Sequence, residues 1–184
     1  MLAELLATER VEEHVVLRAG VGFMALHGGL EVATAEIAEL AASESGSSLY
    51  AIVQPDDLRW HIPSALHDPD DSAGLATFLG HVSTVFSIHG FGRDDLPDAV
   101  LLGGSDRAAA AALGRRLRET TDLDVIDDLD AVPAGLRGTH PDNPVNLAAG
   151  GGVQVELSPG ARAPSVVDSV VAALVETAVA AMQG

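Results

Sequence analysis

Two histidines and a glutamate are spaced so that they could bind one metal ion. His27 and His89 each end an apolar run of strand length, and each is followed at once by glycine. Glu31 follows His27 by four positions, across a glycine turn. Two imidazoles and one carboxylate form the ligand set of a catalytic zinc, with a fourth position left open for water. The alternative for each histidine is a polar group that closes the end of a core strand.

Glu156 is an acid inside an apolar segment. Its neighbours in residues 153–157 are Val, Gln, Val and Leu. Burying a carboxylate is costly unless a cation or hydrogen-bond donors compensate for the lost water. An acid in this setting is a candidate general base for a water molecule that a metal activates. The alternative is simple alternation, with Gln154 and Glu156 on the solvent-facing side of an edge strand.

Apolar runs of strand length alternate along the chain with segments of helical periodicity. We expect strands at 21–26, 49–53, 84–88, 99–102, 124–126 and 153–157. Helices are expected at about 33–44, 73–81, 106–120 and 164–182, with a short helix or irregular lead-in at 1–16. This order predicts an α/β fold, a three-layer sandwich around a mixed, mostly parallel sheet. Ligands of such sheets bind beyond the carboxyl ends of the strands, where His27 and His89 are placed.

Composition limits the function classes. The formal net charge is −17, the basic residues are all arginine, and there is no cysteine. Disulfides and thiolate sites are therefore excluded, and neither nucleic acid nor an anionic membrane is an expected partner. We expect one domain over residues 1–184, located in the cytoplasm because the N-terminus lacks a secretory pattern. The acidic, lysine-free composition suits a host with high internal salt; a GC-rich genome is the alternative.

Three segments of the chain resemble the poly-γ-glutamate hydrolase family. They are Ala-Leu-His-Gly-Gly-Leu-Glu at 25–31, Phe-Ser-Ile-His-Gly-Phe at 86–91 and Gly-Val-Gln-Val-Glu-Leu-Ser at 152–158. Further similarity covers residues 61–64, 101–104 and 138–146. Members of this family, some of which are called phage-related replication proteins, are similar to compact zinc carboxypeptidases. The family commonly has one more residue than this chain between the first histidine and the glutamate.

The resemblance implies roles for individual residues. It implies Zn²⁺ held by His27, Glu31 and His89, with Glu156 as the general base. Arg162 falls where the family tends to carry an arginine, which would bind a substrate carboxylate or polarise the scissile carbonyl; a surface ion pair is the alternative.

Further residues in two loops are candidates for substrate binding. His61, or its neighbour His67, could line the cleft from a long acidic loop, although an exposed loop position is the alternative for both. His140 and Asn146 could shape the cleft by hydrogen bonding, or they could stabilise a turn.

The implied reaction is zinc-dependent hydrolysis of γ-glutamyl or related amide bonds, in a small molecule or a peptide. A short γ-glutamyl peptide or an N-acyl amino acid is an equally reasonable substrate, because the acidic chain would repel a polyanion at low salt. A metal-binding domain without turnover is the alternative from a different class. The sequence makes no prediction of oligomeric state.

Overall fold

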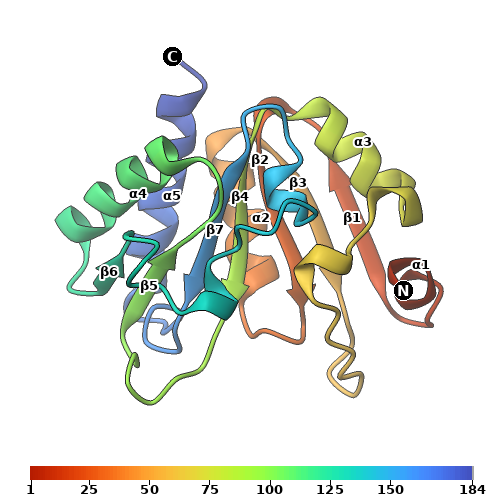
Figure 1. Ribbon diagram of the computed structural model, residues 1–184, viewed down its shortest axis with the longest axis horizontal. Helices are drawn as coiled ribbons and strands as arrows, with labels where there is room; N and C mark the ends of the chain where they lie inside the picture. Colours follow the sequence, from red (N-terminus) through yellow and green to blue (C-terminus); the bar gives the residue numbers. More distant parts are fainter. Residues whose placement is uncertain (184) are drawn as a thin grey trace.

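The computed structural model describes residues 1–183 (Figure 1). Its strands are β1 Glu12–Val16, β2 Ala19–Gly28, β3 Ser47–Val53, β4 Thr84–Gly90, β5 Ala99–Leu102, β6 Asp124–Ile126 and β7 Gly152–Leu157. Its α-helices are α1 Leu2–Leu6, α2 Thr34–Ser45, α3 Ala73–His81, α4 Arg107–Thr120 and α5 Val167–Ala181. Short 3₁₀ turns, named η1 to η4, occur at Ser64–Leu66, Pro69–Asp71, Ala134–Leu136 and Pro144–Asn146.

The strands form one sheet with the order β1-β3-β2-β4-β7-β5-β6. Neighbouring strands are parallel from β3 through β2 and β4 to β7. At the two sides, β1 runs antiparallel to β3, and β5 runs antiparallel to β7. The predicted mixed, mostly parallel sheet is thus confirmed. The carboxyl ends of β2, β4 and β7 lie at one edge, where the polar residues of interest follow.

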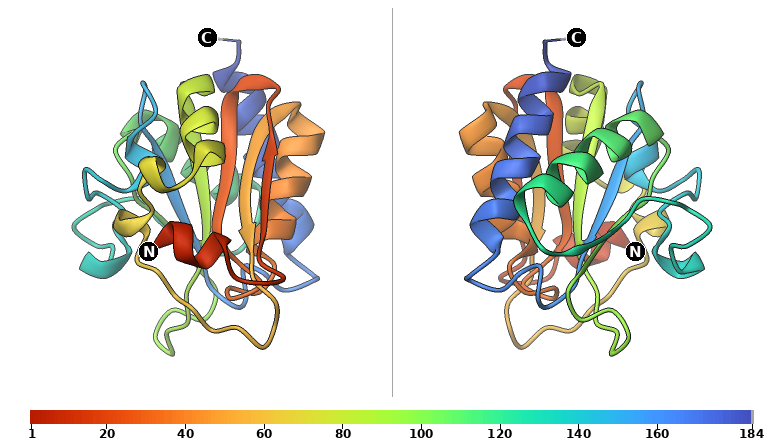
Figure 2. Two further views of the ribbon diagram at one scale, coloured as in Figure 1. Left: turned by 90° about the vertical axis from the view of Figure 1, so that its right-hand side faces the viewer. Right: turned by 90° about the vertical axis from the view of Figure 1, so that its left-hand side faces the viewer.

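Helices cover both faces of the sheet, as the predicted three-layer arrangement requires. On one face α2, α4 and α5 pack against one another and the sheet (Figure 2). Their apolar side chains join those of the strands in the larger core cluster, in which the rings of Phe23 and Phe86 stack at 5.5 Å. On the other face α1 and α3 contribute Leu2, Leu5 and Phe78 to a second cluster. Each large apolar side chain buried in this way stabilises the fold by about 1.5–3 kcal/mol.

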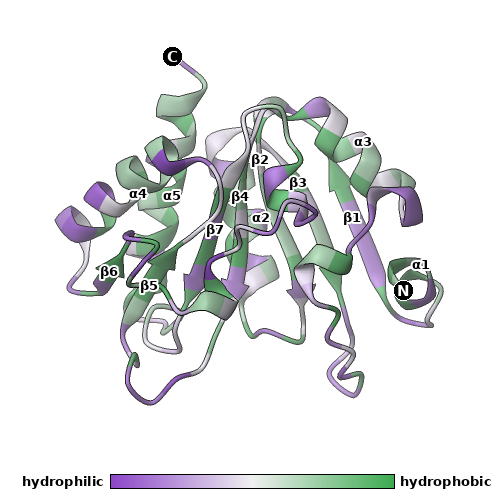
Figure 3. Cartoon of the chain, in the orientation of Figure 1, coloured by the Kyte–Doolittle hydropathy of each residue, from purple (hydrophilic) through white to green (hydrophobic). Residues whose placement is uncertain are grey.

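The first part of the chain differs from the prediction. Residues 1–16 contain not only the short helix α1 but also the strand β1, which pairs with β3 at the edge of the sheet. All five β1 residues are exposed, and the strand is coloured largely hydrophilic in Figure 3. An exposed edge strand carries neither an apolar run nor a buried face, so its sequence lacks the signal on which strand prediction depends.

A tight turn between β2 and α2 brings Glu31 back toward His27. Gly29 has a φ of +76°, and a Cβ atom at this position would lie 2.0 Å from the carbonyl oxygen of Gln54. Only glycine fits such a backbone conformation at such close range. The turn closes with hydrogen bonds from the backbone N–H groups of Leu30 and Glu31 to the carbonyl of His27, at 3.1 and 2.8 Å.

Candidate metal centre and active site

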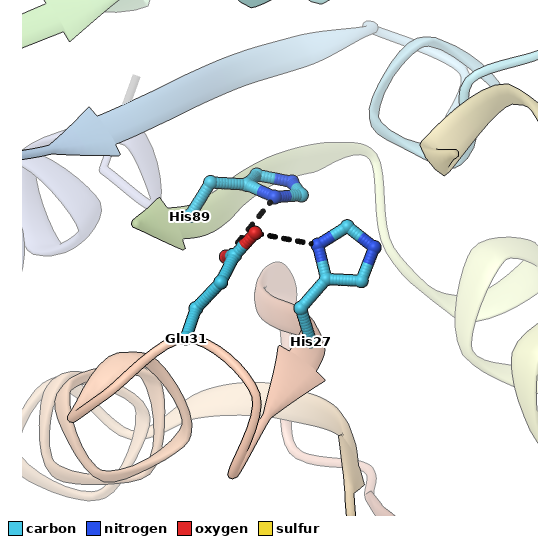
Figure 4. Close-up of side chains that lie close together, drawn as sticks. All are labelled: His27, Glu31 and His89. Carbon is cyan, nitrogen blue, oxygen red and sulfur yellow. Dashed lines mark hydrogen bonds and ion pairs between the residues drawn. The ribbon is translucent and has the colours of Figure 1, made fainter. Parts of the chain in front are cut away.

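His27, Glu31 and His89 converge at the carboxyl end of the parallel strands (Figure 4). His27 is near the end of β2, Glu31 lies in the turn before α2, and His89 is near the end of β4. The Nδ1 atom of His27 is 2.9 Å from Glu31 Oε1, and the Nδ1 atom of His89 is 3.6 Å from Glu31 Oε2. One donor atom from each residue lies within 4.8 Å of the other two. The sequence therefore predicted correctly which three side chains come together.

The outer nitrogens of both imidazoles have partners of their own. His27 Nε2 donates to the carbonyl of Ile62 at 2.8 Å, so Nδ1 faces Glu31 and can bind a metal through its lone pair when the ring is neutral. His89 Nε2 is 2.9 Å from the hydroxyl of Ser87. Second contacts of this kind fix the ring orientation of histidines that bind metals. Two oriented Nδ1 atoms and one carboxylate fit a zinc ion with an open position.

Glu31 is held as a carboxylate. Burial alone would raise its pKa, but hydrogen bonds and charge from His27 and His89 hold the pKa well below its usual range. The backbone N–H of Gly90 also donates to Glu31 Oε2, at 2.8 Å. In turn, although burial opposes a charge on His89, the carboxylates of Glu31 and Glu156 raise its pKa. The negative charge of the carboxylates at this site is therefore paired with positive charge on the histidines.

Glu156 lies beside His89 on the neighbouring strand. The two residues are paired in the parallel register of β4 and β7, so their side chains project to the same face of the sheet. Glu156 is only 4% exposed, which excludes the solvent-facing alternative. Burial raises the pKa of its carboxyl, against the opposing effects of His89 and of a 2.8 Å hydrogen bond from Gln154. A buried carboxylate with a raised pKa is a suitable proton acceptor.

A cavity of about 550 Å³ opens over these residues. Its wall contains His27, Glu31, His89 and Glu156 together with segments from two loops. The loop before α3 contributes His61, Pro63, Ser64 and Ala65, and the loop before β7 contributes Ala134, Gly135, Leu136, Gly138, Thr139, His140 and Asn143. His61 and His140 thus lie at the cavity, whereas Asn146 is not part of its wall.

Asn146 and Arg162 lie outside the cavity wall, and both donate to backbone carbonyls. The Asn146 amide donates to the carbonyls of Gly138 and His140, at 2.7 and 2.9 Å, and so holds the loop that carries His140. The Arg162 guanidinium donates to the carbonyl of Val32 at 2.7 Å and packs behind Gly90, where a Cβ atom would lie 2.9 Å from Nη1. Burial lowers the Arg162 pKa, which Glu31 and Glu156 oppose.

His67 is buried beneath the site and not exposed on its loop. It is 1% exposed, its ring centre lies 5.5 Å from that of His27, and its Nε2 atom has no hydrogen-bond partner among the described residues. The other loop histidine, His61, lies against His27 at the cavity, with the two rings tilted and their centres 4.6 Å apart. Of the two loop histidines, the structure therefore brings His61 to the cavity and His67 into the layer behind it.

Sequence reasoning missed two linked amides, of which one bonds Glu156. Gln154 and Asn143 are both buried, both line the cavity, and are joined by a 2.8 Å hydrogen bond. Gln154 is two residues before Glu156, so both project to the same face of β7. This spacing was a usable signal, but alternation of polar residues equally fits an exposed strand face.

Comparisons with known proteins agree with the fold. No curated protein matches the chain. A bacteriophage poly-γ-glutamate hydrolase has a similar structure, with a TM-score of 0.76 and 22% identity over 91% of this chain and 87% of the phage chain. The zinc-free form of YNDL gives a TM-score of 0.74 and 21% identity, over 91% and 88% of the two chains. A Burkholderia mallei protein named as a candidate carboxypeptidase gives 0.59 and 12%, over 94% and 59%.

The sequence itself carries the family assignment. The family model described as poly-gamma-glutamate hydrolase matches residues 3–171, which include His27, Glu31, His89 and Glu156. Among residues 1–183, no helix is long and apolar enough to cross a membrane. The chain is thus an enzyme of the hydrolase class, and it belongs to the poly-γ-glutamate hydrolase family.

Proposed function

We propose that the protein is a zinc-dependent amide hydrolase whose metal is held by His27, Glu31 and His89. The observation that carries this proposal is the convergence of three donor atoms within 4.8 Å at the wall of a cavity that also contains Glu156. Zinc-free YNDL, a protein of similar fold, supports the choice of metal. The fixed outer nitrogens of both histidines support it independently.

The chemistry divides between the metal and Glu156. Zinc at such a site lowers the pKa of a water molecule toward neutrality and polarises a carbonyl oxygen. Glu156 accepts a proton from the water as the water oxygen bonds to the carbonyl carbon. When the C–N bond breaks, Glu156 donates that proton to the nitrogen of the leaving amine. Its raised pKa helps it to hold the proton between the two transfers.

The substrate is proposed to be a γ-glutamyl or related amide, as the family suggests. His61 and His140 would contact it, because both line the cavity. Asn146 would act through the loop that it holds. Arg162 would supply positive charge from behind Gly90; to bind a substrate carboxylate directly, its guanidinium would have to leave the carbonyl of Val32.

Metal content and turnover together test the proposal. The purified protein is expected to contain stoichiometric zinc and to cleave at least one member of a panel of γ-glutamyl amides, γ-glutamyl peptides and N-acyl amino acids. A chelator should abolish cleavage, and added zinc should restore it. Zinc without cleavage would instead indicate a metal-binding protein that lacks turnover, and cleavage that resists the chelator would contradict a metal mechanism.

We further propose that the protein works in a cytoplasm of high salt. The support is its net charge of −17 and its lack of lysine. At molar salt the Debye length falls to about 3 Å, so self-repulsion is largely screened. The midpoint of thermal unfolding should therefore rise steadily from low salt to molar KCl. A midpoint that does not depend on salt would contradict this part of the proposal.

A further inference from the structure

The side chain of Gln154 is the only hydrogen-bond partner that the described residues give to the carboxylate of Glu156. Gln154 Nε2 donates to Glu156 Oε1 at 2.8 Å and to the carbonyl of Leu136 at 3.3 Å. Its Oε1 accepts a hydrogen bond from Asn143 Nδ2 at 2.8 Å. All of these groups lie at the cavity wall, and Gln154 is only 4% exposed.

The direction of these hydrogen bonds is fixed by their partners. The backbone N–H of Val145 faces Asn143 Oδ1 at 3.4 Å, so the Asn143 amide presents its nitrogen to Gln154. The oxygen of Gln154 therefore faces Asn143, and its nitrogen faces the acceptors on Leu136 and Glu156. A flipped Gln154 amide would place its oxygen against these two acceptors. The amides thus form a chain that ends in a donor directed at the carboxylate.

Close packing prevents the Gln154 amide from turning away. The Gln154 backbone is bonded in both directions to Gly103, with N···O distances of 2.8 and 3.2 Å. Gly138, at a φ of +61°, covers the amide so closely that a Cβ atom there would lie 2.4 Å from Gln154 Oε1. A side chain that is locked by packing and by second contacts can hold its partner within a fraction of an ångström.

We propose that Gln154 is a positioning residue that fixes the orientation of the Glu156 carboxylate. With Oε1 bonded to Gln154, the other oxygen of Glu156 is left for the water proton. This inference rests on the proposed function, because it requires Glu156 to be the proton acceptor. Gln154 itself does not touch the reacting atoms.

The loop that supplies Asn143 is also held without Gln154. The Asn146 amide bonds the carbonyls of Gly138 and His140, and the N–H of Gly104 donates to the carbonyl of Arg137 at 2.8 Å. Loss of the Gln154 amide should therefore leave the cavity wall in place. A lower kcat in a variant without this amide would therefore report the orientation of Glu156 and not the binding of substrate.

The test is Gln154→Met, which keeps the length of the side chain and removes its donor. Misplacing a reacting group by about 1 Å can cost roughly 100-fold in rate, so we expect kcat to fall roughly 10- to 100-fold while KM and zinc content stay unchanged. Gln154→Leu serves as a second variant if the first folds poorly. Tyr50→Phe is the matched control, since it removes another side-chain hydrogen bond to a carboxylate, outside the cavity wall, and should keep the parental kcat.

Two outcomes would overturn the positioning role. One is a parental kcat in Gln154→Met, and the other is a loss of activity that follows lost zinc or a raised KM. Glu156→Gln, measured in parallel, separates this inference from the proposed function. If Glu156→Gln keeps parental turnover, the assigned base is wrong; if it loses turnover while Gln154→Met does not, only the inference fails.

Discussion

Two carboxylates in this protein, Glu31 and Glu13, each interact with two other side chains, but their surroundings differ. Glu13 on β1 accepts hydrogen bonds from the hydroxyls of Tyr50, at 2.8 Å, and of Ser72. Gly74 closes over it, since a Cβ atom there would lie 2.8 Å from Glu13 Oε1. Glu31 instead faces two imidazole nitrogens whose rings are fixed from behind, at the wall of a cavity.

The comparison shows what separates a candidate active site from a structural polar cluster. Around Glu13 the partners are hydroxyl donors. Glu13, Tyr50 and Ser72 are not part of the wall of the cavity that contains the histidines. Around Glu31 the partners are imidazole nitrogens, which can bind a cation when the rings are neutral, next to space for a substrate. Hydrogen bonding to a carboxylate occurs in both regions, although Glu13 itself is exposed, so such bonding is not evidence of function by itself. The convergence of metal-binding atoms at the wall of a cavity is the feature that indicates function.

The largest expected effect comes from exchanging the proposed base. Glu156→Gln should lower kcat roughly 100- to 10,000-fold, the range for removal of a general acid–base group, while zinc content stays at the parental level. Glu13→Gln is the matched variant in the other cluster and should keep parental kcat, because Glu13 does not line the cavity. Steady-state kinetics and elemental analysis of both variants measure this difference. Equal losses of kcat in the two variants would contradict the contrast between the two regions.

The next effect concerns the residue behind His89. Ser87→Ala removes the hydroxyl that lies 2.9 Å from His89 Nε2. Loss of such an outer partner typically weakens metal binding about 10- to 100-fold. A competition titration with a zinc-binding dye should show this loss, whereas Ser72→Ala, in the Glu13 cluster, should leave zinc affinity unchanged. Unaltered affinity in Ser87→Ala would contradict the role of Ser87 in orienting His89.

These expectations depend on details that the sequence reveals unequally. The metal set was predictable because His27 and His89 end apolar runs, and the parallel order of strands brings such ends together. Asn143 was not foreseen, although it lines the cavity while the predicted Asn146 holds the loop. Both lie in one turn-rich segment, and which amide faces inward depends on the turn at Pro144. Backbone conformation of this kind is not encoded in residue type alone.

A third expectation is an acid-dependent loss of stability from His67. Burial, with a further effect of His27, lowers the pKa of His67 from its ordinary value of 6.5 to about 4. The folded state therefore favours the neutral ring, and its stabilising contribution is complete above about pH 6.5 and is lost as pH falls toward 4. One pKa unit corresponds to about 1.4 kcal/mol, so the contribution is about 3 kcal/mol.

The variant His67→Gln isolates this contribution. The free energy of unfolding of the zinc-free protein is measured with denaturant from pH 7.5 to 4. Over this range it should decrease by about 3 kcal/mol more in the parent than in the variant. Curves that stay parallel across this window would show that His67 does not titrate as its burial predicts.

The smallest effect is expected in the Glu13 cluster. Tyr50→Phe removes one hydroxyl that donates to Glu13, and the free energy of unfolding should fall by about 1 kcal/mol, the usual net value of one hydrogen bond. Denaturant unfolding measures this change. A loss of zinc or of kcat in this variant would mean that the two regions are coupled, against the contrast drawn here.

The position of the metal tests the central claim most directly. A crystal structure of the zinc-loaded protein, with anomalous scattering recorded at the zinc edge, should place one zinc about 2.0–2.2 Å from the Nδ1 atoms of His27 and His89 and from a carboxylate oxygen of Glu31. Zinc bound elsewhere, or a site that lacks any of these three ligands, would contradict the account.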